Sequence, residues 1–176
     1  MKRNTKITLS ALTAALSTAF MLVSYFPYLT YAIPAIAGLF MLMPLVETDY
    51  RYSYGAYLVS SVLILLFAEK EAAVLYVCFF GHYPITKAMI EKIRKPLVEW
   101  TVKILLFNVC VLIGYALLSF VFDIHIEDLG EFGRYSAYIL LGFANIVFVV
   151  YDIAISRGAT VYVYKIHPQI KKIMKN

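Results

Sequence analysis

Two asparagines inside apolar runs carry the most informative hydrogen-bonding groups of the sequence. Asn108 and Asn145 are each flanked on both sides by aliphatic and aromatic residues. An amide surrounded by hydrocarbon needs hydrogen-bonding partners. Each asparagine is therefore predicted either to bond a neighbouring helix or to contact a ligand. Together with Arg134, the pair would suit a small ligand that has hydrogen-bonding edges and an anionic group.

The histidines and cysteines, which often bind metals or catalyse reactions, show no spacing that suits either role. The histidines His82, His125 and His167 fall in different segments without metal-ligand spacing. Cys78 and Cys110 lie in apolar runs and form no C-x-x-C motif, which favours a packing role. Nucleotide-binding, zinc-protease and serine-hydrolase motifs are also missing. We therefore expect no metal, no cofactor and no enzymatic activity, and a membrane enzyme with scattered active residues is a weaker alternative.

A few charged residues lie next to, or inside, the apolar runs. Glu99 and Lys103 have the i, i+4 spacing of a helical ion pair. Asp152 is predicted to pair with Lys103, Arg157 or another cation, and the alternative is a proton relay. Lys87, Glu91 and residues 92–95 are assigned to the cytoplasmic side as topological charges, with contact to a partner as the alternative.

A local interruption is predicted just before these charges. Gly81 and Pro84 flank His82 in the run that precedes residues 92–95, and both residue types bend or loosen membrane helices. Such a break marks either a functional site or hinge, or a passive kink.

Overall composition decides which elements must position these side chains. The 176 residues are 62% hydrophobic and only 15% charged, and the mean hydropathy is +0.77. Soluble domains carry about 45 to 50% apolar and about 25% charged residues, so this chain is predicted to use lipid as its main solvent.

A membrane helix needs about 20 mostly apolar residues. Six runs approach or exceed that length: Ile7 to Phe26, Tyr31 to Val46, Tyr52 to Ala68, Ala72 to Ile90, Leu97 to Phe122 and Tyr135 to Ile155.

The distribution of positive charge orients these runs. Lys and Arg accumulate in cytoplasmic segments of membrane proteins. With six spans and the N-terminus inside, fourteen of the 16 cations fall on the cytoplasmic side, and only Lys70 and Arg134 fall outside. We therefore predict an all-α, multi-pass protein with six transmembrane helices and both termini cytoplasmic, in a bacterial inner or plasma membrane. Residues 1–158 are assigned to the transmembrane domain and residues 159–176 to a basic cytoplasmic tail. The net charge of +5 is thus attributed to topology, not to nucleic-acid binding.

The first run carries a stripe of small residues. Ala11, Ala15 and Ala19 are spaced at i, i+4 and i+8 and share one helical face. Small residues let membrane helices approach closely. The stripe is predicted to form either a contact inside the bundle or a docking face for a separate membrane subunit.

The basic N-terminus that runs directly into this alanine-rich helix (Lys-Ile-Thr-Leu-Ser-Ala-Leu-Thr-Ala-Ala-Leu) resembles the substrate-binding S-components of energy-coupling-factor (ECF-type) transporters. Length, six predicted spans and cytoplasmic termini agree with that family across the chain. The resemblance implies that Ala11, Ala15 and Ala19 dock on an energising transmembrane subunit that works with two ABC ATPases. It also implies a small nutrient as substrate, such as a vitamin or its precursor.

In that family the substrate binds near the outer face. Residues predicted at the outer helix ends include several tyrosines, which an aromatic interface belt would also explain. The candidate substrate-binding residues are Tyr76, Asn108, Arg134, Tyr138 and Asn145. The competing hypothesis is a six-span scaffold for envelope assembly without a transported ligand, in which Asn108 and Asn145 contribute only to stability.

Overall fold

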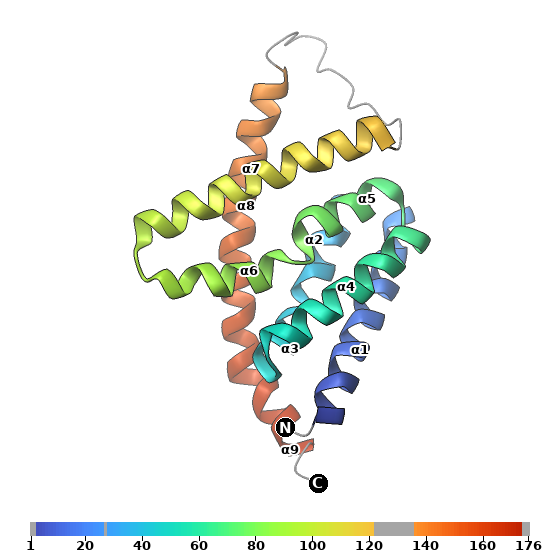
Figure 1. Ribbon diagram of the computed structural model, residues 1–176, viewed down its shortest axis with the longest axis vertical. Helices are drawn as coiled ribbons and strands as arrows, with labels where there is room; N and C mark the ends of the chain where they lie inside the picture. The colour runs from blue at the N-terminus through green and yellow to red at the C-terminus, as the bar shows by residue number, and fades with distance from the viewer. Residues whose placement is uncertain (1–2, 27, 122–135, 174–176) are drawn as a thin grey trace.

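The computed structural model describes residues 3–26, 28–121 and 136–173, and within these ranges it contains helices and no β-strand (Figure 1). Four helical segments are long and apolar enough to cross a membrane: Arg3–Tyr25, Lys70–Ile93, Pro96–Phe120 and Tyr138–Ile170. A shorter apolar segment covers Ala32–Glu47. The all-α class and the apolar, membrane-compatible helices predicted from composition are confirmed.

The helices occur where the six apolar runs are found, but three of the runs are divided. In chain order they are α1 (Arg3–Met21), the 3-10 helix η1 (Leu22–Tyr25), α2 (Ala32–Leu39), α3 (Leu42–Glu47), α4 (Tyr50–Phe67), α5 (Lys70–Leu75), the π-helix η2 (Tyr76–Phe80), α6 (Tyr83–Ile90), the 3-10 helix η3 (Glu91–Ile93), α7 (Pro96–Val121), α8 (Ser136–Val161), the π-helix η5 (Tyr162–Ile166) and α9 (His167–Ile173). The helix α8 passes through Gly158 without interruption, so the residues assigned to the tail begin as a continuation of that helix.

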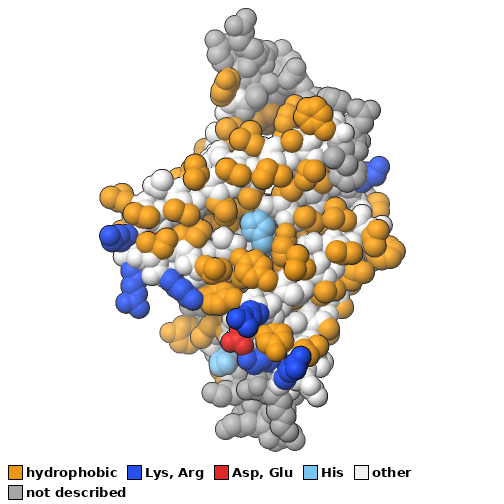
Figure 2. Space-filling view, in the orientation of Figure 1, with side chains coloured by type: hydrophobic (Ala, Val, Ile, Leu, Met, Phe, Trp, Pro, Cys, Tyr) orange, Lys and Arg blue, Asp and Glu red, His pale blue; other side chains and the backbone are white. Residues whose placement is uncertain are grey.

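In Figure 1, α8 extends along most of the longest axis and α7 crosses it, while α1 and α4 lie side by side. The start of α1 and the short helix α9 lie at the same end of the molecule. Apolar side chains cover much of the visible surface (Figure 2). On α4 the exposed aliphatic residues include Leu58, Val62 and Leu66. A contiguous apolar surface of this kind is unfavourable in water but suits a lipid environment.

The helices α1 and α4, which contact each other, both bury small side chains. Ser10, Ala14 and Ser17 of α1 are buried, and so are Ala56 and Ser60 of α4. Small residues allow two helix backbones to approach closely, which favours association in lipid through packing and hydrogen bonds.

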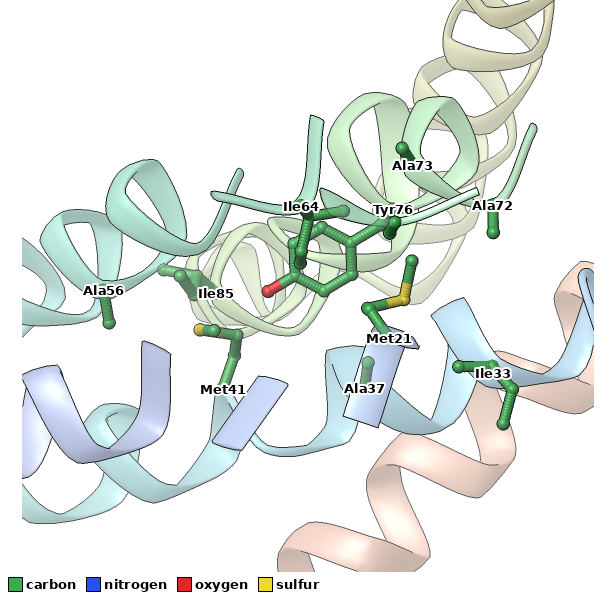
Figure 3. Close-up of a cluster of buried hydrophobic side chains, with 11 residues drawn as sticks. Met21, Ile33, Ala37, Met41, Ala56, Ile64, Ala72, Ala73, Tyr76 and Ile85 are labelled. Atoms are coloured by element: carbon green, nitrogen blue, oxygen red, sulfur yellow. The ribbon is translucent and has the colours of Figure 1, made fainter. Parts of the chain in front are cut away.

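Buried hydrophobic side chains form two clusters in the core. The first joins α1, α2, α4, α5, η2 and α6 around Tyr76, whose ring lies beside Ile64 and Met21 (Figure 3). The second is aromatic and joins α3, η2, α6, α7 and α8; in it the Phe107 and Phe148 rings stack with centroids 4.6 Å apart. Because η2 and α6 contribute residues to both clusters, this segment connects them.

One glycine permits the closest approach between segments. A Cβ atom at Gly38 of α2 would lie 2.3 Å from the backbone oxygen of Phe80 in η2. No side chain fits at that distance, so α2 packs directly on the backbone of the π-helix. This contact helps to position the irregular segment that leads into α6.

Candidate functional site

A network of charged side chains is buried where α6, α7 and α8 meet. Its centre consists of Lys87 of α6, Lys103 of α7 and Asp152 of α8, which are 3%, 1% and 4% exposed. Charged groups inside a membrane protein are costly and are usually paired. Their burial therefore requires a closely matched set of partners.

Asp152 accepts hydrogen bonds from two residues of α6. The Tyr83 hydroxyl donates to Oδ1 of Asp152 at 2.6 Å, and Lys87 Nζ donates to the same oxygen at 2.5 Å. Lys87 Nζ also lies 2.9 Å from Oε1 of Glu91, one turn further along the chain. Tyr83, Lys87 and Glu91 have i, i+4, i+8 spacing, so one face of the segment supplies all three groups.

Lys103 connects the remaining carboxylates. Its Nζ lies 2.8 Å from Oε1 of Glu99, 3.0 Å from Oε1 of Glu91 and 3.3 Å from Oδ1 of Asp152. The predicted Glu99–Lys103 pair is confirmed, and so is the prediction that Asp152 pairs with a nearby cation. With all five groups ionised, the two lysines and three carboxylates carry a formal charge of −1.

The sequence-based assignment of Lys87 to the cytoplasmic side as a topological charge missed its role in this network. Lys87 lies inside α6 and is bound to Asp152, 65 residues away in the chain. Two of the fourteen cations counted as cytoplasmic, Lys87 and Lys103, are thus buried in helices. The signal that could have identified Lys87 is the four-residue spacing of Tyr83, Lys87 and Glu91. Arg157, the other predicted partner of Asp152, is exposed.

The helix carrying Lys87 begins after the predicted interruption. α5 passes into the π-helix η2, and α6 begins again at Tyr83, with Pro84 in its first turn. A Cβ atom at Gly81 would lie 2.7 Å from Cε1 of Tyr76, so this turn requires a residue without a side chain. The prediction that the helix is broken near Gly81 and Pro84 is confirmed.

His82 stabilises the broken segment. Its Nε2 lies 2.8 Å from the backbone oxygen of Cys78, and its Nδ1 lies 3.2 Å from Oγ1 of Thr86. The nearby Cys110 Sγ lies 3.9 Å from Nε2. Among the residues that the structure describes, no group of three or more His, Cys, Asp or Glu side chains is arranged to hold a metal ion. The visible role of His82 is thus to bond backbone and side-chain groups near the π-helix.

The two asparagines singled out by the sequence face each other across α7 and α8. Asn108 Nδ2 donates to Oδ1 of Asn145 at 3.0 Å, and Asn145 Nδ2 donates to Oδ1 of Asn108 at 3.2 Å. Each Nδ2 also donates at 2.8 Å to the backbone oxygen one turn earlier, at Ile104 and Leu141. The pair therefore forms a reciprocal interhelical hydrogen bond.

The other predicted binding residues are not gathered around this pair. Tyr76 is fully buried, and its hydroxyl lies 2.9 Å from Oγ of Ser60. Tyr138 is 73% exposed near the start of α8. Arg134 lies outside the residues that the structure describes. Within the described part of the chain, no hydrogen bond joins Tyr76 or Tyr138 to the asparagines.

The alanine stripe of α1 lies on its exposed face. Ala11, Ala15 and Ala19 are all exposed, whereas Ser10, Ala14 and Ser17 of the same helix are buried, and α1 packs on α4. Leu12 and Leu16, next to the alanines, are also exposed. The face is therefore apolar and accessible. Comparison of the chain with models of protein families, with curated proteins and with solved structures gives no match.

Proposed function

We propose that this chain is the substrate-binding membrane subunit of an ECF-type importer for a small nutrient, such as a vitamin or its precursor. The observation that carries the proposal is the exposed face of α1, where Ala11, Ala15 and Ala19 form a stripe of small apolar residues. Such a surface allows a second helix to approach closely in lipid. Its partner in this proposal is an energising transmembrane subunit that works with two ABC ATPases.

The proposed topology has six spans and both termini in the cytoplasm, in the cell membrane of a bacterium. It is supported by the helices that cover all six apolar runs and by the charge distribution along the chain. The substrate is proposed to bind at the outer ends of the later helices. Tyr138 and Asn145 lie two turns apart on α8, and Asn108 lies opposite on α7. In this proposal the protein binds and delivers its substrate without chemical conversion.

A specific observation favours a second candidate, a six-span scaffold without a transported ligand. Asn108 and Asn145 already satisfy each other across α7 and α8, so no ligand is needed to hydrogen-bond their amides. In this alternative the pair serves only the stability of the bundle.

The deciding experiment compares two alanine-to-tryptophan variants of the tagged protein, purified gently from its native membrane. Ala15→Trp adds bulk to the α1 face and should abolish co-purification of the energising subunit and its ATPases. Ala154→Trp places the same bulk on an exposed position of α8 and should leave co-purification intact. Both variants should retain the unfolding temperature of the parent protein in detergent, because both positions are exposed.

Two outcomes would contradict the transporter proposal. One is that the unmodified protein brings down envelope proteins and no ATPases, which would favour the scaffold. The other is that Ala15→Trp retains the energising subunit as well as Ala154→Trp does, because the alanine face would then not be the docking surface.

A further inference from the structure

An open depression lies where the first turns of α1 come close to the start of α4. It has a volume of about 610 Å³ and is lined by Lys6 of α1 and by Asp49, Tyr50, Arg51 and Tyr52 at the start of α4. These residues belong neither to the buried ion network nor to the alanine face. The depression is therefore a separate feature of the end of the molecule where α1 begins.

Positive charge predominates around this depression. Lys6 forms an ion pair with Asp49, whereas Arg51 is exposed. Lys92 of η3 lies against the lining residue Tyr50, with its Nζ 4.2 Å from the ring centroid. Arg3 stands one turn before Lys6 on α1. In Figure 2, some of the Lys and Arg side chains lie toward this end of the visible face, and others lie at its left edge.

Neighbouring carboxylates do not cancel this charge. Glu47, just before the depression, is 2% exposed and is bound by His167 at 2.8 Å and by the Tyr162 hydroxyl at 3.3 Å. Glu91, next to Lys92, is bound by Lys87 and Lys103 in the buried network. Among the residues that the structure describes, Asp49 is thus the one carboxylate in the lining, and the local balance favours an anion.

The start of α4 adds hydrogen-bond donors. The side chain of Asp49, which precedes α4, does not bond the first amide groups of the helix. The amides of Tyr52 and Ser53 donate to the backbone oxygen of Asp49, which leaves those of Tyr50 and Arg51 as the ones that lack an intrahelical acceptor. These amides and the helix dipole favour a negative group at this position. They supplement the cations of the lining.

Apolar surface adjoins the same cations. Ile7, the neighbour of Lys6, is 49% exposed, and Tyr50 and Tyr52 are amphipathic rings of the type that favours the headgroup region. A ligand with both a phosphate and hydrocarbon chains would match this juxtaposition better than a free ion would.

We propose that this depression binds the phosphate of an anionic phospholipid headgroup, with Arg51 and Lys92 supplying the positive charge that Asp49 does not neutralise. Basic segments at the cytoplasmic membrane surface attract anionic lipid in this way. The site requires only that the protein is embedded in a membrane and is independent of the transporter proposal. It would fix this end of α1 and α4 at the headgroup level.

The test measures lipid binding to the full-length protein in neutral detergent by native mass spectrometry. Phosphatidylglycerol should bind saturably, and phosphatidylcholine should bind more weakly because its headgroup has no net charge. Arg51→Gln should weaken phosphatidylglycerol binding about fivefold, the effect expected for one cation near an anionic lipid. Arg51→Lys should retain most of the affinity. Lys70→Gln removes one positive charge beyond the other end of α4 and should leave the affinity unchanged.

Inorganic phosphate distinguishes the two sources of this chemistry. Weak competition by phosphate that depends on Arg51 would support a lipid site, because the hydrocarbon contacts would then add affinity. Phosphate binding as tight as that of phosphatidylglycerol would overturn the lipid assignment in favour of a soluble anion. Equal effects of Arg51→Gln and Lys70→Gln would overturn the site itself. An unchanged unfolding temperature of each variant without lipid ensures that loss of binding is not loss of folding.

Discussion

At the residue scale, Asp152 is the buried anion on which the ion network depends. Its side chain is 6% exposed, whereas those of Glu91 and Glu99 are 41% and 20% exposed. Two lysines from different helices lie within 3.3 Å of its Oδ1. The buried ammonium groups of Lys87 and Lys103 therefore depend on Asp152 for a negative charge that is shielded from solvent.

Replacing Asp152 tests this dependence. Asp152→Asn keeps the shape but removes the buried negative charge, and we expect a loss of about 2 to 3 kcal/mol in unfolding free energy. Breaking a buried ion pair typically costs about 3 to 5 kcal/mol. The loss expected here is smaller, because Glu91 and Glu99 still neutralise the lysines. Asp49→Asn makes the same change in the exposed pair with Lys6, where at most about 1 kcal/mol is expected. Equilibrium unfolding in detergent measures both values.

A double variant separates charge from packing at this site. In Asp152→Asn combined with Lys87→Met, the ammonium group that lost its buried partner is also removed. This protein should be more stable than Asp152→Asn alone. Equal losses for Asp152→Asn and Asp49→Asn, or no recovery in the double variant, would argue against a network held by buried charge.

At the element scale, α7 and α8 are joined by an asparagine pair in addition to the Lys103–Asp152 ion pair. Hydrogen bonds between membrane helices contribute about 0.6 kcal/mol on average and up to about 1.7 kcal/mol. The reciprocal geometry of Asn108 and Asn145 favours a value in the upper part of that range. The pair also fixes how the two helices are rotated relative to each other.

A double-mutant cycle with Asn108→Ala and Asn145→Ala measures this coupling. The single variants should each destabilise the protein, and the double variant should lose about 1 kcal/mol less than their sum. Unfolding in detergent provides the three free energies. Strictly additive losses would show that the hydrogen bonds contribute no coupling.

At the scale of the whole molecule, charge distribution and helix order predict how the chain crosses the membrane. Lys70, at the start of α5, and Lys95, before α7, are exposed and are separated by the helical segment Lys70–Ile93. If this segment spans the bilayer once, the two positions face opposite sides. In the proposed six-span topology, three crossings precede Lys70, so the N-terminal end of α1 should share a side with Lys95.

Single-cysteine labelling tests this arrangement. In a background with Cys78→Ala and Cys110→Ala, Lys70→Cys should react with a membrane-impermeant maleimide in right-side-out vesicles. Lys95→Cys should react only after the vesicles are permeabilised. The cysteine-free background should remain unlabelled, and equal access to both positions in sealed vesicles would contradict a single crossing between them.

Features that depend on neighbouring residues in the chain were predictable. The apolar runs located the helices, the i, i+4 spacing predicted the Glu99–Lys103 pair, and Gly81 with Pro84 predicted the break before α6. Hydropathy, helical spacing and backbone restriction are properties of consecutive residues, so they can be read along the chain. They also determined that the protein is all-α and suited to lipid.

Contacts between distant helices were decided only by the tertiary structure. The sequence left Asn108 and Asn145 without assigned partners and counted Lys87 as a cytoplasmic charge, yet the two asparagines bond each other and Lys87 reaches Asp152. The alanine stripe of α1 was compatible with either an internal or an exposed face until packing on α4 left it exposed. Which side chains meet depends on how helices cross and rotate, and packing of their surfaces fixes both. Local spacing places a residue on a helical face, but only the assembled bundle determines what that face contacts.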